Sequence, residues 1–139
     1  MRRWMTSKIT WNEAVARQPR AALVLRGGPS LSAAARAAIE DGANEKFVSH
    51  ATAWEVAVKS SLGKLKLSVP YEDFFPGILI SNGFQVLTPD FRHYQELITL
   101  PFHHRDPFDR LLIAQAKVEG LTVVTIDPQF RAYGVPVLW

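Results

Sequence analysis

The sequence predicts an α/β fold, a three-layer α/β/α sandwich built on a mainly parallel sheet. From residue 30 onward, short apolar segments alternate with longer segments of helical periodicity, which is the pattern of repeated strand–helix units. One short segment, "LTVVT" at 121–125, is apolar at nearly every position, as expected of a strand buried on both faces of a parallel sheet. The chain has 139 residues, 47% of them hydrophobic, which suits one domain with its own core.

Two predicted helices flank the first predicted strand. Strong helix formers in "SLSAAARAAIEDG" follow a serine cap, either Ser30 or Ser32, and this helix stops near Gly42. The strand is "KFVSH", and the helix "TAWEVAVKSSLG" follows it, with Gly63 suited to the position just past its end. That helix has three apolar residues on one face, Trp54, Val58 and Leu62.

The middle of the chain repeats this order. "YEDFFPGILISNG" predicts a helix that is interrupted or bent near Pro76 and closed by Asn82 and Gly83. "FQVLT" is the second strand, and "DFRHYQELITL" is a helix capped by Asp90.

The last third completes the pattern. A helix is predicted from about residue 107 to residue 119, ended by Gly120. The strand "LTVVT", a short helical turn in "DPQFRAYG" and a last strand "VPVLW" follow it. We therefore assign residues 30–139 to one α/β domain.

Residues 1–29 are expected to stand outside this alternation, as an atypical N-terminal segment. A parallel α/β domain usually opens with an apolar strand, but the one apolar run here, "AALVL", is broken at once by "RGGPS".

Composition excludes several classes of protein. There is no cysteine, so disulfides and thiolate metal sites are absent and a reducing cytoplasm is the expected location. No run of eighteen apolar residues predicts a membrane span, and the basic start has no apolar segment of a secretory signal behind it. The net charge of +3 and the pI of about 9.4 favour a nucleic-acid partner only mildly.

Three acids fall where ligands bind in parallel sheets, at or near the carboxyl ends of strands. Asp127 follows "LTVVT", Glu55 lies in the helix after "KFVSH", and Asp109 lies one turn into the helix before "LTVVT". Carboxylates without histidine or cysteine partners suit a hard cation, Mg²⁺ or Mn²⁺, which neutralises phosphate and activates water.

Helix capping is the competing explanation for some of these acids. Asp106 and Asp127 each precede a proline, as N-caps often do, and Asp109 would be favoured by the helix dipole. Glu55 caps nothing and lies among apolar neighbours. We interpret Asp106 as mainly a cap and an accessory acid of the site, and Asp109 as mainly a metal ligand.

Three segments resemble PIN-domain ribonucleases, specifically the VapC toxins of bacterial toxin–antitoxin pairs: "FVSHATAWEVAVKSSLGKLKL", "HHRDPFDRLLIAQAKVEGLTVVTIDPQF" and "YGVPVLW". The resemblance covers about residues 31–139. It implies a nuclease that binds Mg²⁺ or Mn²⁺ through three or four acids and cleaves RNA, a homodimer, and a cognate antitoxin that covers the acidic groove.

The resemblance also assigns roles to individual residues. Glu55, Asp109 and Asp127 match the second, third and fourth acids, and Thr125 matches a hydroxyl that lines the site. A threonine at a strand end is an equally good reading of Thr125. Arg105 could contact RNA phosphate, although the loop "HHR" is also typical of a solvated loop.

The first acid of the family has no counterpart in this chain. The family opens with a strand that ends in aspartate, as in "LLDSH", followed by an apolar "LLW" helix; "VARQPRAALVLRGGPSLS" stands in that place and has no aspartate. Asp41 comes too late to substitute, and Glu13 lies in a polar context. One codon choice for residues 17–27, read one nucleotide later, gives Asp-Ser-His-Ala-Leu-Leu-Trp, so a shifted reading frame is a hypothesis for this segment.

Three functions remain open at this point. The first is an Mg²⁺-dependent endoribonuclease toxin, impaired by the loss of the first acid. The second is a non-catalytic PIN-like module that retains antitoxin or RNA binding. The third, a phosphohydrolase on another α/β fold, needs a nucleophilic acid directly after the first strand, and none is present.

Overall fold

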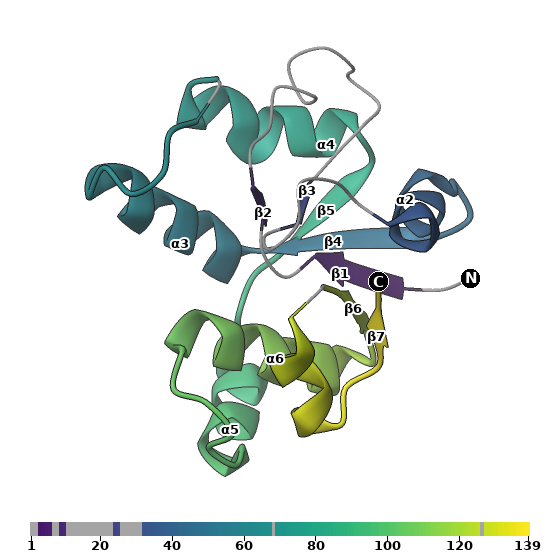
Figure 1. Ribbon diagram of the computed structural model, residues 1–139, viewed down its shortest axis with the longest axis vertical. Helices are drawn as coiled ribbons and strands as arrows, with labels where there is room; N and C mark the ends of the chain where they lie inside the picture. Colours follow the sequence, from purple (N-terminus) through teal and green to yellow (C-terminus); the bar gives the residue numbers. More distant parts are fainter. Residues whose placement is uncertain (1–2, 7–8, 11–23, 26–31, 68, 126) are drawn as a thin grey trace.

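The computed structural model describes residues 3–6, 9–10, 24–25, 32–67, 69–125 and 127–139 (Figure 1). In these segments the main sheet has five strands in the order β5-β4-β1-β6-β7, and each pair of neighbours is parallel. The strands are β1 (Arg3–Thr6), β4 (Glu45–Ser49), β5 (Phe84–Leu87), β6 (Thr122–Val124) and β7 (Val137–Leu138). The predicted parallel α/β fold is confirmed, with "LTVVT" between two parallel neighbours and not at an edge.

One strand from residues 1–29 takes part in the main sheet. β1 is the central strand, paired with β4 on one side and with β6 on the other, so part of this segment does join the sheet. Its sequence, Arg-Trp-Met-Thr, lacks the apolar run that marks a buried strand. Only the central methionine, Met5, is described as a buried side chain. A separate antiparallel pair is formed by β2 (Ile9–Thr10) and β3 (Val24–Leu25).

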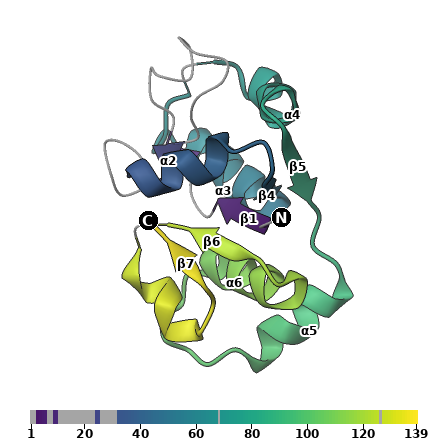
Figure 2. The same ribbon diagram turned by 90° about the vertical axis from the view of Figure 1, so that its right-hand side faces the viewer.

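Helices cover both faces of the sheet, as Figures 1 and 2 show. One face carries α5 (Phe91–Thr99), α6 (Pro107–Glu119) and the 3₁₀ helix η2 (Pro128–Tyr133). The other carries α2 (Ala33–Glu40), η1 (Asp73–Ile78) and α4 (Leu79–Ser81). α3 (His50–Ser61) continues directly from β4.

Alternation along the strands supplies both cores. Phe47 and Val123 pack in the cluster with α5 and α6, while their neighbours Val48 and Val124 pack in the cluster with α2 and η1. This is the period-2 pattern of a strand buried on both faces, and it is why these strands read as continuous apolar runs.

The helix boundaries follow the local sequence signals. Ser32 is the N-cap of α2, Asp90 of α5, and Asp106 of α6, each through a side-chain oxygen that accepts a backbone N–H. The predicted interruption near Pro76 is present, because Phe75 has a non-helical backbone with φ −103° and ψ 112°. None of the helices in the described segments is long and apolar enough to cross a membrane.

The end of α6 gives a first test of these backbone rules. Gly120 has φ +65°, and a methyl group placed there would meet nothing within 4 Å, so Gly120→Ala changes backbone strain alone. We expect the substitution to lower the free energy of unfolding by about 1–2 kcal/mol, measured by urea denaturation. The matched control is Gly42→Ala, which has equal space and no left-handed φ and should change stability little. Equal losses in both variants would contradict the strain argument.

Candidate metal centre

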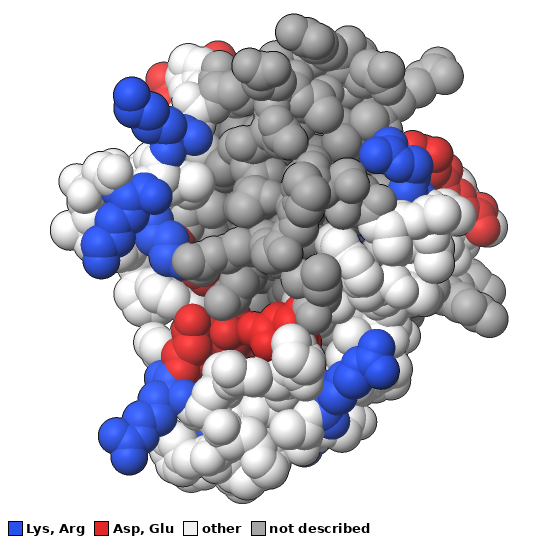
Figure 3. Space-filling view, viewed as in Figure 1, with Lys and Arg blue, Asp and Glu red and all other residues white. Residues whose placement is uncertain are grey.

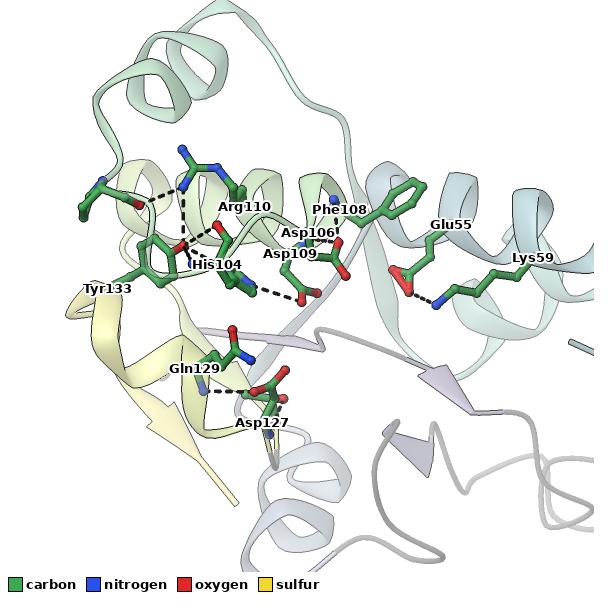
Figure 4. Close-up of polar contacts among 12 residues, drawn as sticks. Glu55, Lys59, His104, Asp106, Phe108, Asp109, Arg110, Asp127, Gln129 and Tyr133 are labelled. Carbon is green, nitrogen blue, oxygen red and sulfur yellow. Dashed lines mark hydrogen bonds and ion pairs between the residues drawn. The ribbon is translucent and has the colours of Figure 1, made fainter. Parts of the chain in front are cut away.

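The carboxyl edge of the parallel sheet gathers the predicted acids from three elements. β4 runs straight into α3, where Glu55 lies in the second turn. β6 ends just before Thr125 and the turn that holds Asp127, and α6 places Asp109 in its first turn. Figure 4 shows Glu55, Asp106, Asp109 and Asp127 around a common region at this edge.

Glu55 is buried and has a cation one helical turn away. Its side chain is 7% exposed, and its Oε1 accepts a bond of 2.8 Å from Lys59 Nζ (Figure 4). A buried carboxylate needs such compensation, because removing the charge from water is costly. Lys59 therefore compensates the charge of a predicted metal ligand.

Asp106 and Asp109 have different surroundings at the start of α6. Asp106 Oδ1 accepts the backbone N–H groups of Phe108 at 3.0 Å and Asp109 at 3.1 Å, so it caps the helix. Asp109 is 1% exposed, and its Oδ2 lies 3.3 Å from His104 Nε2. The capping role predicted for Asp106 is present; a ligand role for either acid stays a proposal.

Thr125 and Asp127 form one small turn after β6. The backbone N–H of Asp127 donates to Thr125 Oγ1 at 3.1 Å, and Asp127 Oδ1 accepts the N–H of Gln129 at 2.9 Å. Thr125 is buried, whereas Asp127 is half-buried. The threonine hydroxyl thus fixes the start of the turn that carries the last acid.

The oxygens of Glu55, Asp109 and Asp127 do not meet at one point. Within the described part of the chain, one group of three possible ligands has its ligand atoms all within 4.8 Å of one another, and it is Asp90, His93 and Glu119. The predicted acids share an edge but stay farther apart than that. Their donor set still fits Mg²⁺, which keeps several waters and needs only one or two direct carboxylates.

The cluster of Asp90, His93 and Glu119 joins α5 to α6 through hydrogen bonds. It was not predicted from the sequence. His93 Nδ1 accepts the N–H of Asp90 at 2.9 Å, and Nε2 lies 2.9 Å from Glu119 Oε1, so both ring nitrogens are used. Arg92 joins the same group, and its hydrogen bond lowers the pKa of the Asp90 carboxyl to about 2. With its imidazole nitrogens engaged, the group holds two helices together and is not assigned to a metal.

The loop before α6 is less solvated than the sequence suggested. His103 and Arg105 are exposed, as expected of a solvated loop, but the His104 side chain is only 12% exposed and contacts both Asp109 and Tyr133. The only sequence feature that could have indicated the buried position of His104 is the pair of adjacent histidines shortly before Asp106 and Asp109. Arg105 has the exposure that contact with RNA phosphate would require.

Charge is unevenly distributed over this face. Figure 3 shows acidic atoms gathered in a band below the centre of this view, with lysine and arginine side chains around it and basic atoms directly against its left end. Such a band attracts cations first, and the surrounding basic groups can contact a polyanion.

Comparison with known proteins adds a family and a fold. The family profile described as PIN domain matches residues 21–136. One similar solved structure is the crystal structure of VapBC2 from Rickettsia felis bound to a DNA fragment from its promoter. One of its chains superposes on this chain with a TM-score of 0.52. It is 14% identical and covers 68% of this chain and 74% of that chain, which shows a shared fold. None of the curated proteins compared with the chain matches it.

Two substitutions distinguish the contribution of the capping hydrogen bonds of Asp106 from that of its charge. Asp106→Ala removes the acceptor for two N–H groups, so we expect a loss of about 1 kcal/mol in the free energy of unfolding. Asp106→Asn keeps an oxygen acceptor and should cost much less. Urea denaturation of both variants measures this, and equal losses would show that the charge of Asp106, and not its hydrogen bonds, stabilises the start of α6.

Proposed function

Because this chain belongs to the PIN domain family, we propose that it is a VapC-like, metal-dependent endoribonuclease, the toxin of a bacterial toxin–antitoxin pair, whose activity is impaired by the loss of the first acid. The observation that carries the proposal is the position of Glu55, Asp109 and Asp127 at the carboxyl edge of a parallel sheet, two of them buried. Buried carboxylates at a ligand-binding edge are what a hard-cation site requires.

Each acid has a distinct part in this proposal. Glu55, Asp109 and Asp127 would hold Mg²⁺ or Mn²⁺, with Asp106 as an accessory acid at the rim. The cation would neutralise RNA phosphate and lower the pKa of a bound water for in-line attack. Thr125 orients the turn of Asp127, and Lys59 holds the Glu55 carboxylate in place through its bond to Oε1.

The centre of the sheet supports the idea of a missing ligand. In the family pattern the first strand ends in aspartate. Here β1 occupies the central position, between the strands that lead to Glu55 and Asp127, and its sequence contains no acid. Fewer carboxylates weaken the binding of a hard cation and loosen the geometry of the attacking water.

The division of the chain into an N-terminal segment and a domain is also a proposal. We keep residues 30–139 as the PIN-like domain and residues 1–29 as an atypical segment, although the family match begins at residue 21 and β1 joins the sheet. Apart from residues 24–25, the segment 17–27 of the frame-shift hypothesis lies outside the described residues, as does Glu13. The DNA sequence upstream of Leu31 tests that hypothesis, since codons that cannot encode aspartate in the shifted frame exclude it.

A second candidate function is a non-catalytic PIN-like module that binds an antitoxin or RNA. The absence of an acid from β1 favours it. The fold is shared with a chain of a VapBC2 complex, which supports a cognate antitoxin as partner. Two exposed side chains, Trp54 in α3 and Leu62 at its C-terminal end, offer apolar surface for one. Homodimer formation, RNA as substrate and contact of Arg105 with RNA belong to the same proposal.

The activity of the unmodified chain is the first test. We expect it to bind Mg²⁺ weakly and to cleave RNA at a rate about 100-fold or more below that of a repaired chain. One repair replaces residues 1–29 with a strand that ends in Asp-Ser-His-Ala-Leu-Leu-Trp, and a smaller one is Thr6→Asp, at the last residue of β1. Cleavage of labelled RNA with and without EDTA measures the effect. Full EDTA-sensitive activity of the unmodified chain would show that the first acid is dispensable or supplied by Glu13.

The role of the third acid is tested in the repaired background. Asp109→Asn keeps the size of the side chain but removes its charge, so metal-dependent cleavage should be abolished. The matched control is Asp73→Asn, an exposed acid of η1 in the layer on the other face of the sheet, which should leave cleavage unchanged. A repaired chain that binds its antitoxin but never cleaves RNA would favour the non-catalytic module.

A further inference from the structure

We propose that His104 is a positioning residue of the acidic site, which donates a hydrogen bond from Nε2 to Asp109 and sets the direction of that carboxylate. The inference rests on the proposed function, because it takes Asp109 as a metal ligand. His104 Nε2 and Asp109 Oδ2 are 3.3 Å apart, and both side chains are almost enclosed, at 12% and 2% exposed. A carboxylate with one oxygen held in this way loses its freedom to rotate (Figure 4).

Tyr133 determines which nitrogen of His104 carries the proton. The tyrosine hydroxyl receives N–H groups from the backbone of His104 at 3.1 Å and from Arg110 Nη1 at 3.4 Å, which fill its two acceptor positions. Its own proton then goes to the nearer acceptor, His104 Nδ1 at 2.7 Å, and not to the His104 carbonyl at 3.4 Å. Because Nδ1 accepts, the ring proton lies on Nε2, which faces Asp109.

Arg110 fixes the loop from which His104 acts. Its guanidinium donates to the carbonyls of Pro101 at 2.8 Å and Leu100 at 3.2 Å, and it lies 3.9 Å from the ring centre of Phe102. Arg110 is buried and directly follows Asp109 in α6. The buried guanidinium of Arg110 therefore fixes the loop that carries His104, next to Asp109.

This arrangement predicts a specific effect on metal affinity. Partners that orient metal ligands typically change metal affinity by about 10–100-fold when they are removed. His104→Leu should weaken Mg²⁺ binding by about that factor, whereas His104→Gln, whose side-chain amide can still donate to Asp109, should retain most of the affinity. Tyr133→Phe removes the partner of Nδ1 and should have a smaller effect in the same direction.

The experiment is an Mg²⁺ titration of the ¹⁵N-labelled full chain, followed by the amide signals of α6, which measures affinities as weak as millimolar. The matched control is His103→Leu, since His103 is exposed and packs edge-on against the same Tyr133 ring, with centroids 4.8 Å apart. Thermal unfolding of each variant confirms that it is folded. A long-range ¹H–¹⁵N spectrum of the unmodified chain reads the tautomer of His104 directly, so that the inference can be tested even where a variant does not fold.

The outcomes separate the inference from the proposed function. Weaker binding in His104→Leu, retained binding in His104→Gln and an Nε2–H tautomer support both. Equal affinity in the unmodified chain and His104→Leu, or an Nδ1–H tautomer, overturns the positioning role and leaves the metal centre standing. No saturable Mg²⁺ effect on the unmodified chain overturns the metal centre and this inference together.

Discussion

The buried guanidinium of Arg110 is the constraint on which the layer formed by α5, α6 and η2 depends. A buried cation is costly unless its hydrogen-bonding capacity is satisfied. Here the carbonyls at the end of α5, those of Leu97, Leu100 and Pro101, accept its N–H groups, and Tyr133 of η2 contributes its hydroxyl. The start of α6, the end of α5 and η2 are thereby joined at one point, and the loop between the two helices has little freedom left. Arg110 directly follows Asp109, so these contacts also restrain the first turn of α6, which carries Asp109.

A second buried contact joins the two helices that carry acids. Ser49, the N-cap of α3, donates its hydroxyl to Gln115 in the middle of α6, and both residues are buried. The same hydroxyl accepts the N–H of Ala51 and so begins α3 at the end of β4. Because this contact joins the start of α3 to the middle of α6, it helps to fix the positions of the helices that carry Glu55 and Asp109.

Local signals made most of this structure predictable. Helices and strands after residue 30 could be identified from apolar periodicity and from caps such as Asp90 and Asp106, because those interactions lie within one turn of the chain. The acids could be placed at one edge because they follow parallel strands. β1 could not be found, since Arg-Trp-Met-Thr owes its central position to pairing with β4 and β6 and not to its own hydropathy. The contacts of His93 with Glu119 and of His104 with Tyr133 join residues more than twenty positions apart, so no local sequence pattern predicts them.

The central position of β1 also has a consequence for how the chain reaches this structure. Its pairing with β6 joins the first residues to some of the last, as with Trp4 opposite Thr122, so the sheet can close only after nearly the whole chain is available. Contacts of such long sequence separation carry a large loop-closure entropy and slow folding. Until that closure, β4 and β6 each present an unpaired edge able to bind another chain. The acidic edge would then be completed only at the final stage of folding, and changes near the N-terminus would affect the yield of soluble protein before they affected its chemistry.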